Sequence, residues 1–327
     1  MILPSKLQQG DEIRVVTLSK SLGSITLNHA EIVKRKLATL GLSVSFGANS
    51  IEVDEDGSLS VLQRVEDLHS AFLDKNVKAI FVARGGYNCN QILPFLDFDL
   101  ISQNPKIIIG YSDITAVINA IYAKTGLVTY SGPGFTSLKD VIFEESDFTY
   151  KYWHKALFEG GETQISSATT IFDECYQGDH TVKSNYESSG FWVINQGLAQ
   201  GEIIGSNLCT LNLLQGTDFM PDISDKIIFI EDDNESKSGN FDRDLESLTQ
   251  LKNFENVRGL VVGVFQKDSE IDRQELTKII KNKVCLDNIP VLANVNFGHT
   301  KPILTFPIGM KAYLNLESNK AKLTINF

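Results

Sequence analysis

Cysteine is scarce in this sequence, and no two cysteines are close together. Four occur among 327 residues, and none forms a C-x-x-C pair. Disulfide frameworks and structural zinc sites use closely spaced or patterned cysteines, so the sequence favours reduced and buried thiols. The four residues are Cys89, Cys175, Cys209 and Cys285.

Long apolar runs are also missing. No window approaches the ~18 consecutive apolar residues of a membrane-spanning helix. The first residues, MILPSKLQQGDEIRVV, lack the charged start and apolar core of a secretory signal. We therefore expect a cytoplasmic protein that does not bind a membrane.

Basic residues are outnumbered by acidic ones. Lys and Arg together number 30 and Asp and Glu number 41, which gives a net charge of −11. Proteins that bind nucleic acid neutralise phosphates mainly with Lys and Arg, so this balance disfavours a nucleic-acid partner. With 42% hydrophobic and 22% charged residues, the composition is that of an ordinary soluble globular protein.

The first 131 residues alternate short apolar runs with segments of helical period. This alternation predicts an α/β fold with a doubly wound, mostly parallel sheet covered by helices. Ser60 stands where the cap of the second helix is expected, and Gly41 where the first helix stops. The expected strands are 12–18, 42–46, 78–84, 106–110 and 127–132.

The periodicity weakens after residue 132, and we expect a domain boundary there. We predict an N-terminal domain over 1–160, a polar connection over 161–190 and a C-terminal domain over 191–327. The last part alternates helices with many short apolar runs, so we expect a smaller mixed α/β domain rich in strands.

Ser112 follows the apolar run KIIIG and precedes an apolar pattern of helical period. A turn between a parallel strand and a helix faces the crevice in which open α/β sheets bind ligands. Backbone N–H groups at a helix start could also stabilise an oxyanion there. The alternative is that Ser112 or Asp113 only caps the helix, and GYSDI lacks the second glycine of the G-x-S-x-G elbow.

A serine nucleophile needs a base, and only five histidines are present. His299 follows an apolar strand in the segment FGHTKP, where its side chain can project into a cleft. Glu231 ends the apolar run KIIFIE, and its carboxylate could orient the imidazole. Asp232 and Asp233 are competitors for this orienting role. Ordinary packing or surface roles are expected for His29, His69, His154 and His180.

A Gly-Gly turn follows the third apolar run, in the segment VARGGYN. Bare backbone at Gly85 and Gly86 can approach a ligand closely and donate amides to an oxyanion. Neither G-x-G-x-x-G nor G-x-x-x-x-G-K-[ST] occurs there, so a nucleotide site is weakly supported. Arg84 could pair with a substrate carboxylate or form a structural ion pair. Cys89 is an alternative nucleophile.

Several segments together resemble the LD-carboxypeptidase family of serine peptidases, which includes the microcin C self-immunity peptidases. They occur in the family's order and extend from about residue 12 to 310. The segments are ARGGYNCNQILPFLD, IIGYSDITAVINAIYAKTGLVTYSGP, GEIIGSNLCTLNLLQGT, IIFIEDD and FGHTKPILTFPIG.

The resemblance implies a catalytic triad of Ser112, Glu231 and His299. It also implies an oxyanion hole made by the backbone amides of Asp113 and Gly86. Substrate contacts at Arg84 and Gly85 are a further expectation. Members of the family are cytoplasmic, commonly form homodimers and use neither metal nor cofactor.

Two branches of the family differ in substrate. LD-carboxypeptidases release the terminal D-alanine of murein tetrapeptides, whereas the immunity branch cleaves the amide between an acidic residue and an adenylate analogue. The segments GYSDIT, SGPGFTSL and HTKPILTFPIG favour a peptidyl-nucleotide substrate of the immunity kind, while SGNFDRDLESL resembles the carboxypeptidases. A non-catalytic small-molecule binding protein is the remaining alternative.

Overall fold

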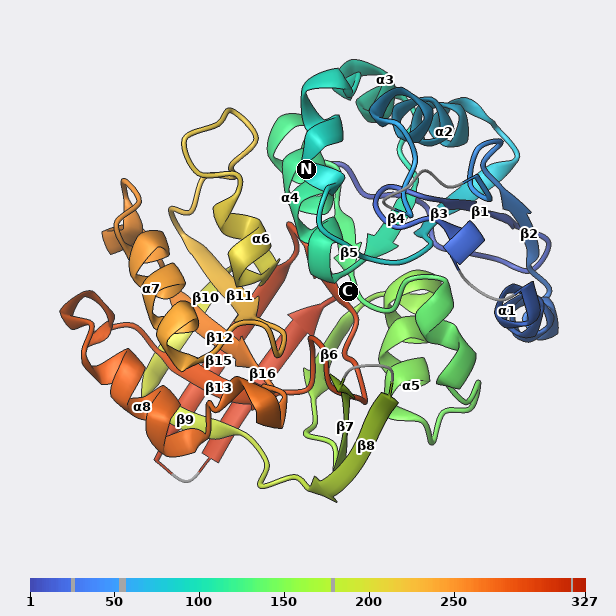
Figure 1. Cartoon of the computed structure of the whole chain (residues 1–327). Helices are drawn as coiled ribbons and strands as arrows, with labels where there is room; N and C mark the ends of the chain where they lie inside the picture. The colour runs from blue at the N-terminus through green and yellow to red at the C-terminus, as the bar shows by residue number, and fades with distance from the viewer. Residues whose placement is uncertain (25–26, 53–56, 178–179, 319) are drawn as a thin grey trace. The chain divides into compact units, whose positions relative to one another are not determined.

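The computed structural model describes residues 1–24, 27–52, 57–177, 180–318 and 320–327 (Figure 1). The chain forms two compact units. Unit 1 comprises Met1–Gly160, Gly216–Pro221 and Thr305–Gly309. Unit 2 comprises Gly161–Gln215, Asp222–Leu304 and Met310–Phe327.

Unit 1 contains a six-stranded sheet in the order β14-β5-β4-β3-β1-β2. Strands β1 to β5 run parallel, and β14 pairs antiparallel with β5 at the edge. This is the doubly wound sheet that the sequence predicts. Its strands are β1 (Glu12–Val16), β2 (Ser43–Phe46), β3 (Val77–Val82), β4 (Ile107–Gly110), β5 (Thr129–Ser131) and β14 (Phe306–Ile308).

Helices cover both faces of this sheet, with α2 and α3 on one face and α1 and α5 on the other (Figure 1). Burial on both faces explains why β4 is a continuous apolar run rather than an alternating one. The helices are α1 (Leu27–Thr39), α2 (Val61–Leu73), α3 (Phe98–Gln103), α4 (Thr115–Thr125) and α5 (Phe148–His154). Shorter helical turns are η1 (Leu22–Ser24), η2 (Cys89–Phe95), η3 (Ser112–Ile114), η4 (Thr136–Asp140) and the π-helical η5 (Lys155–Glu159).

The two predicted helix boundaries are confirmed. The Ser60 side chain accepts a hydrogen bond from the Gln63 backbone N–H, and the Gln63 side chain bonds back to the Ser60 backbone, which forms a capping box. Gly41 has φ of 74°, the left-handed conformation that suits the end of α1.

Unit 2 contains an eight-stranded sheet in the order β6-β16-β15-β10-β11-β12-β13-β9. Its centre, β10 to β13, is parallel, and antiparallel strands extend it on both sides. The strands are β6 (Glu162–Ile165), β9 (Trp192–Asn195), β10 (Gly197–Asn207), β11 (Lys226–Glu231), β12 (Gly259–Gly263), β13 (Val291–Val295), β15 (Lys311–Glu317) and β16 (Lys320–Asn326).

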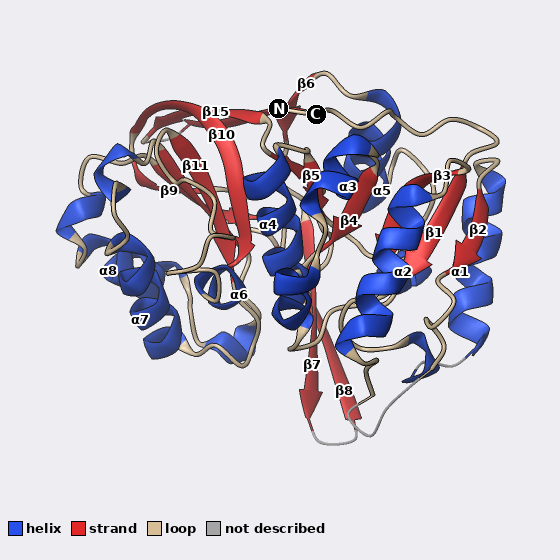
Figure 2. Ribbon diagram, turned by 90° about the horizontal axis from the view of Figure 1, so that it is seen from above, coloured by secondary structure: helices blue, strands red, loops and turns tan. Residues whose placement is uncertain are grey.

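Helices α6 (Leu208–Asn212), α7 (Ser238–Thr249) and α8 (Arg273–Lys281) follow strands of this sheet (Figure 2). A separate hairpin joins β7 (Thr170–Gln177) and β8 (His180–Glu187). The turns are η6 (Phe254–Asn256), η7 (Lys267–Ser269) and η8 (Val284–Leu286). The expected fold class, a doubly wound part plus a strand-rich mixed α/β part, is confirmed.

Two features lie outside what the periodicity indicates. The segment 161–190, for which we expected a connection, carries β6, β7 and β8. The run at 305–309, which we expected in the C-terminal domain, lies in unit 1 because β14 pairs with the edge strand β5. An added antiparallel strand satisfies the backbone groups of an otherwise open edge, and such distant pairing leaves no local sequence signal.

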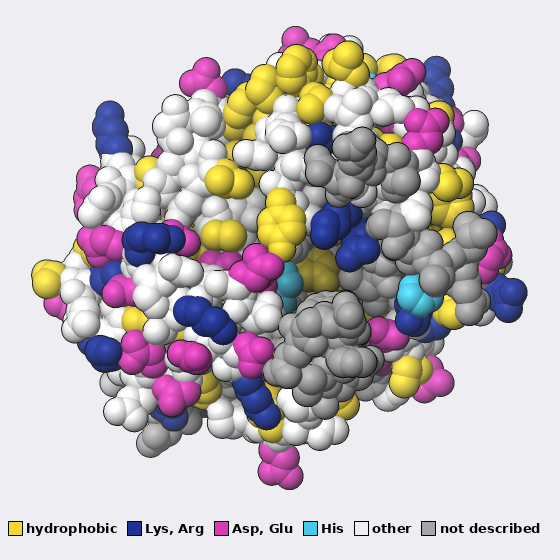
Figure 3. All heavy atoms as spheres, viewed as in Figure 1, with side chains coloured by type: hydrophobic (Ala, Val, Ile, Leu, Met, Phe, Trp, Pro, Cys, Tyr) yellow, Lys and Arg dark blue, Asp and Glu magenta, His cyan; other side chains and the backbone are white. Residues whose placement is uncertain are grey.

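The surface of unit 1 carries an apolar area over α3, where hydrophobic side chains gather in Figure 3. Phe95 is 54% exposed there, and the rings of Phe98 and Phe219 lie 5.9 Å apart.

Among the described residues, no helix is both long enough and apolar enough to span a membrane.

Candidate active site

The strand order of unit 1 reverses between β1 and β3. Strand β2 lies on one side of β1, while β3, β4 and β5 follow on the other. Open α/β sheets bind ligands outside the carboxyl ends of the strands at such a reversal. Ser19 follows β1, Gly85 and Gly86 follow β3, and Ser112 follows β4. The serine and the two glycines that the sequence singled out therefore share this edge of the sheet, together with Ser19, which it did not single out.

Ser112 occupies a sharp turn between β4 and η3. Its φ is 61°, in the left-handed region that residues with a side chain seldom adopt. Gly110 permits the turn, because a Cβ there would lie 2.8 Å from Cγ2 of Ile114. Backbone strain of this kind concentrates at functional sites, and a nucleophile elbow has the same strand-turn-helix form.

The helix-cap alternative receives no support from the starts of η3 and α4. The cap positions are Tyr111 and Ile114, and neither makes a side-chain capping bond. The Asp113 carboxylate instead accepts hydrogen bonds from residues that follow β1 and β3. Its Oδ2 receives the Ser19 hydroxyl at 2.6 Å and the backbone N–H groups of Asn88 and Cys89 at 3.0 Å each.

The two glycines after β3 are required by close approach. A Cβ on Gly85 would lie 3.1 Å from Cβ and 3.2 Å from Oγ of Ser112. A Cβ on Gly86 would overlap the Ser19 hydroxyl. The Gly-Gly turn is thus packed directly against the Ser112 turn and the end of β1.

Two arginines near this turn have different surroundings. Arg84 is half-buried, and its guanidinium forms no hydrogen bond or ion pair with any residue that the structure describes. Arg64 is 1% exposed and donates to the backbone oxygens of Leu18 and Asn88 at 3.1 and 2.9 Å. Arg64 was not predicted from the sequence, because a charged residue in an amphipathic helix is ordinarily on the surface.

Cys89 does not suit the alternative role of nucleophile. It is fully buried, and its thiol donates to the Asp113 carbonyl oxygen at 2.6 Å. Burial, followed by the nearby Asp113 charge, raises its pKa well above the usual range. A reactive cysteine needs an accessible thiolate, so Cys89 has a structural role.

In unit 2, Glu231 and His299 form the pair that the sequence predicts. Glu231 is the last residue of β11 and is fully buried, and its Oε2 lies 2.8 Å from Nδ1 of His299. Gly298 makes room for this contact, since a Cβ there would overlap the Glu231 carboxylate. The His299 side chain remains 17% exposed.

Asn207 supports the pair and was not found from the sequence. It ends β10 and is in register with Glu231. Its Nδ2 donates to Oε1 of Glu231 at 3.3 Å and to Oδ1 of Asp232 at 3.1 Å. The segment GEIIGSNL places a polar residue directly after a strand and before a helix, which is the same signal that revealed Ser112.

The electrostatics of the pair favour a charged imidazole. Burial lowers the pKa of His299, but the Glu231 charge and hydrogen bond, with Asp233 and Asp232, raise it to about 9 overall. Burial raises the pKa of Asp232 to about 7, and repulsion from Glu231 and Asp233 acts in the same direction. Asp232, a competitor of Glu231 in the sequence, is also fully buried.

Three other histidines have local partners. His69 accepts the Asp97 N–H at 3.0 Å, and His29 lies 3.2 Å from Nζ of Lys139. His154 bonds Glu159 at 3.0 Å. The side chain of His180 lies outside the described residues.

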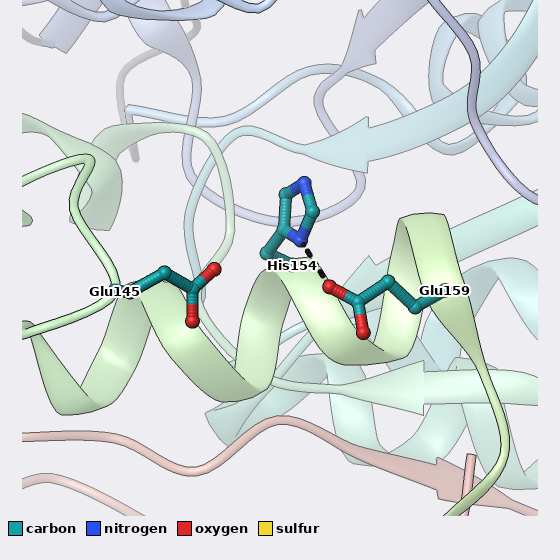
Figure 4. A group of neighbouring side chains, drawn as sticks. All are labelled: Glu145, His154 and Glu159. Carbon is teal, nitrogen blue, oxygen red and sulfur yellow. Dashed lines mark hydrogen bonds and ion pairs between the residues drawn. The ribbon is translucent and has the colours of Figure 1, made fainter.

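One group of potential metal ligands occurs among the described residues: Glu145, His154 and Glu159 (Figure 4). The two glutamates are exposed, and Glu159 pairs with both His154 and Lys155 at 3.0 Å. Ion pairs therefore account for His154 and Glu159, and we assign the group no metal.

Profiles of the LD-carboxypeptidase N-terminal and C-terminal domains match residues 13–132 and 200–314. The chain is 43% identical to "Putative carboxypeptidase YocD" of Bacillus subtilis, over 98% of each chain. The chain belongs to the LD-carboxypeptidase family. Membership of this peptidase family supports the assignment of the protein as a hydrolase.

Other members of the family differ in the function that their names give. The "Microcin C7 self-immunity protein MccF" of Escherichia coli is 30% identical over 99% of this chain and 96% of that protein. The "Probable murein peptide carboxypeptidase" of Bacillus subtilis is also 30% identical, over 97% of this chain and 93% of that protein.

Solved structures match the fold over nearly its full length. An MccF-like protein from Bacillus anthracis has a TM-score of 0.94 at 42% identity, with 100% of this chain and 99% of that chain covered. MccF in complex with glutamyl sulfamoyl guanosine has a TM-score of 0.87 at 28% identity, with 99% and 98% covered.

Proposed function

We propose that the protein is a serine peptidase or amidase that hydrolyses an amide of a small peptide conjugate. Ser112 is the nucleophile, His299 the general base and Glu231 the residue that orients the base. The observation that carries this proposal is the 2.8 Å contact between Nδ1 of His299 and the buried Glu231 carboxylate. With the proton of neutral His299 on Nδ1, its lone pair is on Nε2, where a base is needed.

The reaction has two stages. Nε2 of His299 takes the Ser112 proton as Oγ attacks the carbonyl carbon, and Glu231 stabilises the imidazolium that results. The amides of Asp113 and Gly86 receive the charge on the carbonyl oxygen, and loss of one such donor typically costs about 10²-fold to 10³-fold in turnover. The leaving amine takes the proton from His299. Water, activated by the same imidazole, then hydrolyses the acyl-enzyme.

We place the protein in the immunity-like branch, with an aminoacyl or peptidyl adenylate analogue as substrate. The structure of MccF with aspartyl sulfamoyl adenosine supports this class of ligand, as does the match to the MccF-like protein. Arg84 and Gly85 would contact the substrate, and the Arg84 guanidinium would pair with an anionic group. Release of D-alanine from a murein tetrapeptide is the alternative, which the murein peptide carboxypeptidase supports.

The test is to incubate the purified protein with aspartyl sulfamoyl adenosine and, separately, with a murein tetrapeptide. We expect aspartate and sulfamoyl adenosine from the first and no product from Ser112→Ala. Release of D-alanine alone would reassign the protein to the carboxypeptidase branch. Binding of either compound without hydrolysis would make it a non-catalytic binding protein.

We also propose a cytoplasmic homodimer, as the family resemblance implies. Sedimentation equilibrium should then give twice the chain mass of 36.3 kDa. A mass of one chain at micromolar concentration would contradict this proposal.

A further inference from the structure

The Asp113 side chain joins three segments that approach the Ser112 turn. Its Oδ2 accepts the Ser19 hydroxyl after β1 and the Asn88 and Cys89 amides after the Gly-Gly turn. The residue is 3% exposed, so these bonds form away from water. Hydrogen bonds to an ionised acceptor are about twice as strong as neutral ones, and buried donors that lose their acceptor pay the full cost of desolvation.

These contacts fix the glycines against the nucleophile. Asn88 and Cys89 follow Gly86 by two and three residues. Their bonds to Asp113 therefore fix the segment that directly follows the Gly-Gly turn. Ser19, the third donor, is the residue that a side chain at Gly86 would overlap. Gly85 packs on Ser112 itself. The Asp113 carboxylate therefore connects the Ser112 turn to the segments that contact the two glycines.

Arg64 makes a second set of hydrogen bonds to the same segments. Nη1 of Arg64 in α2 donates to the backbone oxygens of Leu18 and Asn88, and its Nη2 donates to Oε1 of Gln91 at 2.8 Å. Asn88 Nδ2 also donates to the Ser58 hydroxyl at 3.2 Å. Arg64 thus ties the end of β1 to the Gly-Gly turn, and the Asp113 carboxylate ties both of these segments to the Ser112 turn.

We infer that the Asp113 carboxylate is a positioning residue that preorganises the oxyanion hole, a role separate from that of its own backbone amide. This inference rests on the proposed function. Oxyanion donors act through their placement before the reaction. A displacement of the donors by a few tenths of an ångström therefore weakens stabilisation of the transition state more than it weakens substrate binding. Loss of the carboxylate should therefore lower kcat and change KM little.

The test compares Asp113→Ala, Asp113→Asn and Ser19→Ala with Asp147→Ala as the control. Asp147 also accepts two backbone N–H bonds in unit 1, from Tyr150 and Ile142, but it caps α5. All four variants keep every backbone amide. Each is assayed with whichever of the two proposed substrates the wild type hydrolyses, and hydrogen exchange is followed in the peptide that spans residues 85–93.

We expect Asp113→Ala to lower kcat by about 10²-fold with KM within about threefold, and to speed exchange in this peptide. Asp113→Asn keeps an acceptor oxygen of the same shape and should recover part of both effects. Ser19→Ala removes one of three donors and should cost less. Asp147→Ala should leave kcat and exchange at 85–93 unchanged.

Several results would overturn the inference. They are unchanged exchange in Asp113→Ala, a kcat within about threefold of wild type, or a rise in KM that accounts for the whole loss. If Asp113→Ala does not fold, the same criteria apply to Asp113→Asn. If the wild type hydrolyses neither substrate, the proposed function fails, and the exchange measurement alone decides whether Asp113 holds the turn.

Discussion

Glu231 is a fully buried carboxylate whose charge is compensated by one imidazole. An uncompensated buried charge costs several kcal/mol, so the fold favours the protonated form of His299. This stabilisation is complete below the unfolded pKa, near 6.5, and is lost as the pH rises through about 9. The same pairing that stabilises unit 2 therefore keeps His299 protonated at neutral pH, so that it cannot act as a base.

The pH dependence of the reaction follows from this pairing. Only neutral His299 can accept the Ser112 proton, so kcat/KM should rise with pH to a plateau with an apparent pKa near 9. Rates from pH 6 to 10 would show it, with circular dichroism as the control for folding. A profile that is flat above pH 7 would contradict the assignment of His299 as a cationic resting group.

Gly85 gives a second prediction for a single residue. A methyl group there would lie 3.1 to 3.2 Å from the Ser112 side chain, which is tighter than most Cβ contacts. Gly85→Ala should therefore displace the nucleophile and lower kcat by about tenfold or more, since misplacement of about 1 Å can cost 10²-fold. Gly239→Ala, with nothing within 4 Å of the added carbon, is the control. Equal activity of the two variants would show that Ser112 tolerates the methyl group.

Helices and strands are the scale at which the sequence was most informative. The apolar runs predicted β1 to β5 of unit 1, and Ser60 as a helix cap predicted the start of α2. Ser112, Glu231 and His299 were candidates because each stands at the end of an apolar run, and the family resemblance assigned them to a triad. Asn207 was missed although it stands between an apolar run and a helix, because its contact with Glu231 depends on strand register. Arg64 was missed because one sequence does not show that a charged side chain is buried.

The cap of α2 can be tested without disturbing the candidate site. Ser60→Ala removes the bond to the Gln63 N–H and should lower the free energy of unfolding by about 1 kcal/mol. The change is measured by urea denaturation. The kcat should stay within twofold of wild type, because α2 remains packed through its buried face. A loss of kcat without a loss of stability would mean that Ser60 has another role.

At the scale of the whole molecule, the members of the proposed triad belong to two units. Unit 1 holds Ser112 with the Gly-Gly turn, and unit 2 holds Glu231 with His299. Each half has internal bonds that position it, and neither could perform acyl transfer alone, because a serine hydroxyl needs a base. Their positions at strand ends made these residues candidates, and the family resemblance implied their roles. The approach of Ser112 to His299 remains a prediction, since it depends on residues 187 positions apart.

The most direct measurement is the rate at which a fluorophosphonate probe modifies Ser112. Mass spectrometry identifies the labelled residue, and rates are followed from pH 6 to 10 in wild type, His299→Gln and Ser112→Ala. We predict labelling of wild type at Ser112 alone, with a rate that rises toward pH 9, and a loss of at least about 10²-fold in His299→Gln. Labelling of another residue, or equal rates in wild type and His299→Gln, would contradict the triad.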